Sequence, residues 1–143
     1  MESVETQLCA ELTHLRRGRG LNDPKVHTRI GPGLRQALGI AVTDPAVEQR
    51  DQLRAGLNAA ARSLPPDLGL AMFEALAIDR LSPPTLTARE ERLTEALKTG
   101  PRTVRRRISE ATVLVARNLA PRMARAQASE QFVKPGWEVE ELA

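Results

Sequence analysis

The stretch PRTVRRRISEATVLVARNL, residues 101–119, decides the fold because its apolar side chains recur at the spacing of an α-helix. At 100° per residue, one set of side chains falls within about 80° of arc. This set is Val104, Ile108, Ala111, Val115 and Leu119. Most of the arginines lie on the other side of the same helix. We therefore expect a long amphipathic helix over residues 102–119 whose apolar stripe packs against further helices.

The rest of the chain shows the same helical periodicity, and no segment alternates in the manner of a strand. Start signals mark several helices, among them Asp44-Pro45 and a capping box formed by Thr87 and Glu90. The helices expected before residue 101 cover about residues 3–17, 24–38 with a break at 31–33, 45–64, 67–79 and 88–98. The pattern predicts an all-α fold, a compact bundle of about six helices.

Prolines and glycines set the expected boundaries. Pro121 should interrupt the long helix, because proline lacks the N–H that an interior position donates. We assign residues 1–126 to a single helical domain. Residues 127–143 form either a C-terminal tail or the start of a further segment.

Aromatic residues are nearly absent, and arginine greatly outnumbers lysine. The 143 residues include 18 Arg, 3 Lys and no Tyr, and the only aromatic residues are Phe73, Phe132 and Trp137. Aliphatic side chains must therefore form the core, and single-stranded nucleic acid, which stacks on aromatic rings, is not the expected partner. No apolar run approaches the ~18–20 residues that cross a bilayer, and no secretory signal precedes the first helix. We expect a cytoplasmic protein that does not contact a membrane.

The net charge of +3 is unevenly distributed along the chain. Residues 101–125 carry seven arginines and one glutamate, a net charge of +6, whereas residues 63–100 and 126–143 are both net acidic. A second basic run, RRGRG at residues 16–20, lies at the expected end of the first helix, where positive charge interacts favourably with the helix dipole. The block at 101–125 is the charge feature that points to a function.

No arrangement of reactive residues predicts catalysis or metal binding. His14 and His27 lie on different expected helices without a nearby ligand pattern, and Cys9 has no base at a defined spacing. Glu90 and Glu91 are adjacent and therefore diverge by about 100° on a helix. We expect neither an enzyme nor a bound metal or cofactor.

Residues 93–108, LTEALKTGPRTVRRRI, resemble the second and third helices of helix-turn-helix transcription regulators, including the sigma-factor region that reads promoters. The resemblance implies that residues from about 87 to 120 form a helix-turn-helix-like unit at the C-terminal end of the bundle. In such a unit the second helix of the pair lies in the major groove of DNA. Lys98 stands where these motifs usually carry glycine, and a left-handed conformation there would cost about 1 kcal/mol.

The resemblance implies a set of DNA contacts at the start of the long helix. The residues in this set are Arg102, Thr103, Arg105, Arg106 and Ser109. Arginine can pair with guanine edges or phosphates through two parallel hydrogen bonds. The leading hypothesis is therefore a transcription regulator that reads double-stranded DNA through the helix at 102–119, as a dimer.

Two other interpretations of the arginine block stay open: a solvated helix face, or a surface for an acidic protein partner. The competing functional class is a non-enzymatic helical adaptor that self-associates or docks another regulator through its leucine-bearing N-terminal helices. Over its whole length the chain also resembles helical modules that begin larger actinobacterial proteins, where a Gly-Trp stretch like GWEVE at 136–140 leads onward. Those modules imply no particular function.

Overall fold

The computed structural model describes the backbone of residues 3–142 and the side chains of residues 3–129. Within those residues it is all helical and has no strand, so the predicted all-α class and helix number are confirmed. The six helices are α1 (Val4–Leu15), α2 (Pro32–Leu38), α3 (Ala46–Arg62), α4 (Pro66–Ala75), α5 (Leu86–Leu97) and α6 (Pro101–Leu142). Two 3₁₀ turns, η1 (Gly20–Asn22) and η2 (Val26–Arg29), lie between α1 and α2.

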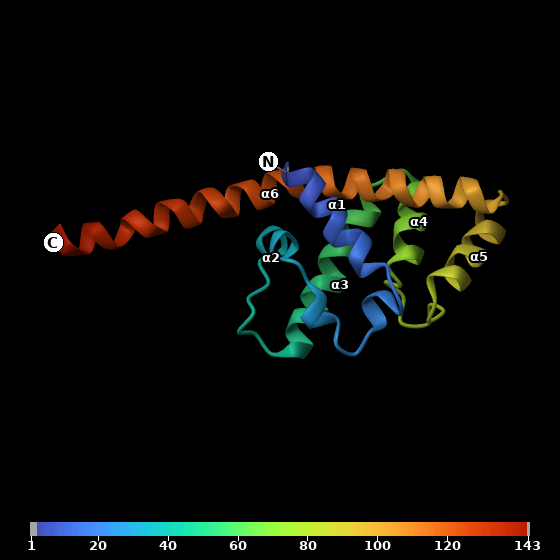
Figure 1. Ribbon diagram of the computed structural model, residues 1–143, viewed down its shortest axis with the longest axis horizontal. Coiled ribbons are helices and arrows are strands. Elements are labelled where there is room, and N and C mark those ends of the chain that lie inside the picture. The colour runs from blue at the N-terminus through green and yellow to red at the C-terminus, as the bar shows by residue number, and fades with distance from the viewer. Residues whose placement is uncertain (1–2, 143) are drawn as a thin grey trace.

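Helix α6 is the element against which the bundle assembles. It runs along one side of the molecule, with the other helices mainly below it in the view of Figure 1. Its most extensive contacts are with α1, α2 and α4. The predicted apolar stripe is buried throughout, with exposed fractions of 0–2% for Val104, Ile108, Ala111, Val115 and Leu119. The apolar spacing therefore identified the face of α6 that packs on the bundle.

The prediction that Pro121 interrupts this helix is wrong, because α6 continues without a break to Leu142. Pro121 lies on the exposed side, whereas Leu119 and Met123 on either side of it are buried in the core. Packing on both sides supplies more stability than the one backbone hydrogen bond that proline removes. Among the described residues no helix, α6 included, is apolar enough over a sufficient length to cross a membrane.

The last part of α6 extends beyond the bundle (Figure 1). The backbone of residues 127–142 therefore continues the long helix, while the side chains from residue 130 onward lie outside the described residues. The predicted boundary at residue 127, with a tail or a further segment after it, stays a prediction.

The core has two parts of unequal size. The larger part joins α1, α2, α3 and α4 to the middle of α6. The smaller part lies where α4, α5 and the first turns of α6 meet, and consists of Ala71, Ala75, Leu93, Val104 and Ile108. Helix α5 and the start of α6 thus depend on a small cluster at one end of the molecule.

The expected helix over residues 24–38 is wrong in its first half. The chain there forms the turn η2 and only then the seven-residue α2. Asp23 Oδ1 accepts the backbone N–H of Lys25, which favours a turn over a helix. Gly31 precedes a proline and is extended, so the helix cannot pass through it.

Side chains cap three of the helix starts, and the first is α1, where the Ser3 hydroxyl accepts the N–H of Thr6 at 3.1 Å. The Glu11 carboxylate on α1 accepts the backbone N–H groups of Gly33 and Leu34 at 3.0 and 2.8 Å, which fixes α2 to α1. Thr85 caps α5, because its hydroxyl accepts the N–H of Ala88 at 3.1 Å. The predicted capping box at Thr87 was therefore placed two residues too late.

Candidate nucleic-acid interface

The connection between α5 and α6 consists of the three residues Lys98, Thr99 and Gly100. Lys98 has φ 52° and ψ 49°, so it holds the left-handed conformation expected for that position. The carbonyl of Thr94 accepts the N–H groups of both Lys98 and Thr99, which ends α5. Gly100 then accepts the N–H of Val104 and opens α6. The two helices form a pair with a short turn, although this alone does not make them a DNA-reading unit.

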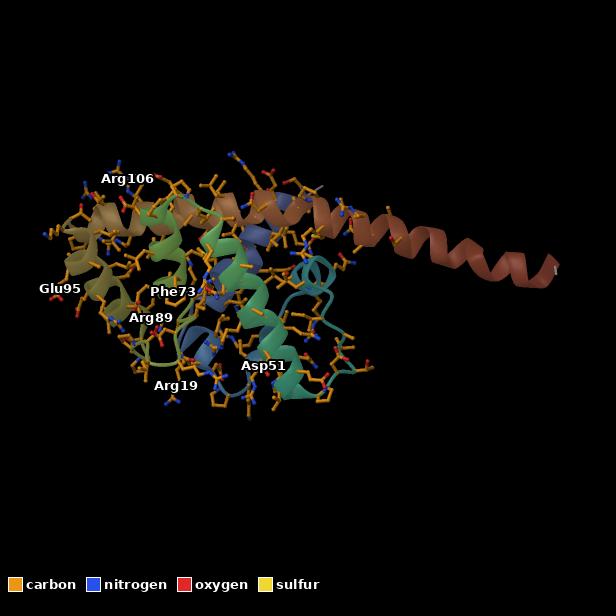
Figure 2. The ribbon with its side chains drawn as sticks, turned by 180° about the vertical axis from the view of Figure 1, so that it is seen from behind. Arg19, Asp51, Phe73, Arg89, Glu95 and Arg106 are labelled. Atoms are coloured by element: carbon orange, nitrogen blue, oxygen red, sulfur yellow. The ribbon has the colours of Figure 1, made fainter. Side chains whose placement is uncertain are left out.

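Four of the five predicted contact residues lie exposed on one side of the first turns of α6. These four residues, Arg102, Arg105, Arg106 and Ser109, are called the α6 arginine face below. Thr103 is half-buried and lies to the side of this face. Figure 2 shows the Arg106 side chain pointing away from the other helices.

The arginines of this face are not neutralised by neighbouring carboxylates. Among the described residues, no ion pair or side-chain hydrogen bond involves Arg102, Arg105 or Arg106. The nearest ion pair on α6 joins Arg107 to Glu110 at 3.5 Å, where both side chains are more than 40% exposed. Three guanidinium groups therefore face solvent with their donors available to another molecule.

The face ends about two turns into the helix. Val113, on the same side, is 38% exposed, and Arg117 further along pairs with Glu5 of α1 at 3.7 Å. Beyond this point α1 and α2 pack on α6. Within the bundle, the start of α6 is therefore the part of this side that α1 and α2 leave uncovered.

The acidic residues of α5 point elsewhere. Glu91 and Glu95 are exposed on α5. Figure 2 shows Glu95 and Arg106 at separate edges of the molecule. Glu95 therefore does not cover the α6 arginine face, and no ion pair among the described residues joins a carboxylate of α5 to this face.

A buried arginine holds α5 in place. Arg89 is 0% exposed and donates to the carbonyl oxygens of Arg16, Gly18 and Pro83 at 2.8, 3.0 and 2.9 Å. Burial lowers the pKa of its guanidinium, and the nearby Glu74 carboxylate acts in the opposite direction. This side chain ties the start of α5 to the end of α1.

A second group of arginines, of which the sequence pattern had marked only Arg19 within the basic run at residues 16–20, gathers on the opposite side of the bundle. Arg50 and Arg54 lie on α3, Arg80 lies in the loop after α4, and Arg19 precedes η1, all lining one cavity. Figure 2 shows Arg106 along α6 at the upper edge of the bundle and Arg19 at the lower edge, on the opposite side. The basic run at residues 16–20 therefore does not share a face with the start of α6. No spacing signal could have revealed this group, because its members come from three distant segments.

No protein-family model, curated protein or solved structure matches this chain significantly. In the described part of the chain, no three His, Cys, Asp or Glu side chains gather as metal ligands would. The arrangement of side chains is thus the basis for a functional proposal.

Proposed function

We propose that the protein binds double-stranded DNA through the α6 arginine face and acts in transcription regulation. The observation that supports this most directly is the orientation of α6. Val104 and Ile108 anchor one side of its first turns in the core, and the opposite side presents three unpaired arginines.

The chemistry of this face suits a duplex. A helix of this diameter fits the major groove, where arginine pairs with the O6 and N7 atoms of guanine or with phosphates. The absence of stacked aromatic rings among these arginines favours a duplex over a single strand. The small core under α5 and α6 holds both helices as one unit, which supports the helix pair as the element that docks.

One arginine face offers few phosphate contacts, so we propose that two copies bind neighbouring half-sites. Duplex-reading helix pairs commonly act as dimers whose half-sites lie one helical turn apart. Light scattering coupled to size-exclusion chromatography measures the oligomeric state in the presence and absence of DNA.

The test is DNA retardation with genomic fragments at ~50 mM salt, where phosphate contacts are strongest. The variant R105Q/R106Q should weaken binding at least about tenfold, because it removes two of the three arginines. The matched control, R19Q/R80Q, removes two exposed arginines on the opposite side of the bundle and should bind DNA as the wild type does. If the wild type retards no DNA, or both double variants lose binding equally, the proposal is wrong.

A second candidate is the adaptor function, and a shallow apolar groove between α3 and α4 favours it. Leu64, Leu70 and Phe73 line this groove of about 350 Å³, and Leu70 is 40% exposed. If this groove mediates self-association, L70E should convert an oligomer to a monomer in light scattering. An adaptor without a DNA function would retain its oligomeric state in R105Q/R106Q and bind no duplex.

A further inference from the structure

The cavity lined by the second arginine group is built from three separate segments. The residues before and within η1, the first half of α3 and the loop after α4 enclose about 570 Å³. Arg19, Arg50, Arg54 and Arg80 line it together with the carboxylates of Asp23 and Asp51. Figure 2 shows Arg19 and Asp51 along the same lower edge of the bundle, on the side opposite Arg106.

Arg54 fixes the wall of this cavity. Its guanidinium donates to the carbonyl oxygens of Ile78 and Leu21, the latter at 3.2 Å, and to Asn22 Oδ1 at 3.0 Å. Asn22 in turn donates to the carbonyl of Asp79 at 2.9 Å. The cavity is thus preformed, because α3, η1 and the loop after α4 are joined to one another by hydrogen bonds.

The backbone of η1 is also constrained. The N–H of Leu21 donates to the carbonyl of Leu76 at 2.8 Å. Gly20 has φ +60°, and a Cβ there would collide with the same carbonyl oxygen. Only glycine allows this close approach of η1 to the end of α4.

The lining has an excess of positive charge. Four arginines and two aspartates give the cavity a formal charge of +2. Asp23 already accepts from Arg29 at 3.1 Å and from the N–H of Lys25 at 2.9 Å. Among the described residues, no ion pair neutralises Arg19, Arg50 or Arg80. The positive charge of Arg80 adds to the effect of burial in lowering the pKa of Arg54.

The ligand that fits this cavity carries an oxyanion with two negative charges. A phosphate monoester brings a charge of about −1.5 to −2, which balances +2, and its oxygens match the paired donors of arginine. Val47, Leu21 and Pro84 line the same cavity and give an organic part an apolar surface. The volume lies within the range of small-molecule sites.

We propose that this cavity binds a small phosphorylated metabolite. Arg19, Arg50 and Arg80 hold its phosphate, and Arg54 keeps the wall in place. The Asp51 carboxylate lines the same cavity and repels the negative charge of the ligand, which limits the charge that the site accepts. This site is independent of the α6 arginine face, and its presence does not rest on DNA binding.

The test uses the full chain and isothermal titration calorimetry with three probes: ribose 5-phosphate, pyrophosphate and succinate. Both phosphate probes should bind in the micromolar to low-millimolar range and raise the melting temperature, whereas succinate should bind at least about fivefold more weakly. Failure of both phosphate probes to bind at ~10 mM, or tighter binding of succinate, would overturn the proposal.

Three variants of this chain distinguish phosphate binding in the cavity from nonspecific attraction to a positively charged protein. R80Q, an exposed position, should weaken phosphate binding about tenfold, and D51N should tighten it several-fold by removing negative charge. R105Q lowers the net charge as R80Q does, yet Arg105 lies on the α6 arginine face, on the opposite side of the bundle, and its change should leave binding unchanged. Equal weakening by R80Q and R105Q would show that the probes bind no particular site, and the proposal would fail. A DNA-binding failure of the wild type leaves these results unaffected.

Discussion

Arg89 and Arg106 are the same residue type on neighbouring helices, and their surroundings give them opposite roles. Arg89 is fully buried and its guanidinium donates to three backbone carbonyls. Arg106 is exposed and has no ion pair or side-chain hydrogen bond within the described residues. Arginine therefore holds the fold together where loop carbonyls lack partners, and is available for binding where the backbone groups nearby are already paired within a helix.

The same contrast separates two groups of arginines. Arg54 and Arg89, the clamp arginines, join segments that lie far apart in the sequence. The arginines of the α6 arginine face join nothing within the described part of the chain. Changes at the clamp arginines should cost stability, and changes on the α6 arginine face should affect only binding.

The largest effect is expected at Arg89. R89M should destabilise the protein by about 3 kcal/mol or more, because it leaves buried carbonyls of Arg16, Gly18 and Pro83 without a donor. R106M, on the exposed face, should change the free energy of unfolding by no more than about 0.5 kcal/mol. Urea denaturation followed by circular dichroism measures both. Equal losses in the free energy of unfolding for R89M and R106M would contradict the distinction between the clamp arginines and the α6 arginine face.

The loop that Arg54 holds should tolerate little change in its backbone. G20A should cost about 2–4 kcal/mol, because it adds a collision with the Leu76 carbonyl to the strain of a positive φ. G18A is the matched control: Gly18 has φ +56° but nothing within 4 Å of an added Cβ. G18A should lower the free energy of unfolding by only about 1 kcal/mol, which is the cost of the positive φ without a collision. A G20A protein as stable as G18A would show that η1 does not depend on its approach to α4.

The turn before the α6 arginine face carries strain that substitution should relieve. K98G should raise the free energy of unfolding by about 0.5–1 kcal/mol, since glycine adopts the left-handed conformation at lower cost. A96G, at an exposed position in the last turn of α5, should lower it by up to about 1 kcal/mol. DNA affinity should be the same in K98G as in the wild type. A destabilised K98G would mean that Lys98 makes a favourable contact that outweighs the strain.

The smallest expected effect is the pH dependence of stability that Asp23 causes. The N–H of Lys25, and to a lesser degree Arg29, lowers the pKa of Asp23 below its ordinary value of 3.8. Because this pKa is lower in the folded state, its contribution to stability is present above about pH 4 and is lost as the pH falls through the folded-state pKa. D23N should therefore be less stable near neutral pH, by about 1 kcal/mol or less, and should lose less stability on acidification. Parallel curves for the two proteins from pH 6 to 2 would contradict this.

The sequence predicted the parts of the fold that depend on local patterns. The apolar spacing of Val104, Ile108 and Ala111 identified the buried face of α6, and the position of Lys98 indicated a left-handed turn. Pro121 was misjudged because packing by Leu119 and Met123 on either side outweighs a local break, which the sequence alone does not reveal.

The arginines show where a sequence pattern stops being informative. Arg102, Arg105 and Arg106 share a helix, so their common face followed from 100° per residue. Arg89 gave no signal of its buried role, because two of its three acceptors, the carbonyls of Gly18 and Arg16, lie 71 and 73 residues away in the chain. The cavity around Arg54 likewise depends on tertiary structure alone.

The measurement that tests the central claim most directly is the salt dependence of duplex binding by the wild type and by R105Q/R106Q. Each phosphate contact contributes a slope of about −0.9 to the plot of log K against log salt concentration. If Arg105 and Arg106 contact the duplex through phosphates, their removal should reduce the slope by roughly 2 per bound copy. R19Q/R80Q should retain the wild-type slope. An unchanged slope in R105Q/R106Q, or an equal loss in R19Q/R80Q, would contradict the assignment of the α6 arginine face as the DNA-binding surface.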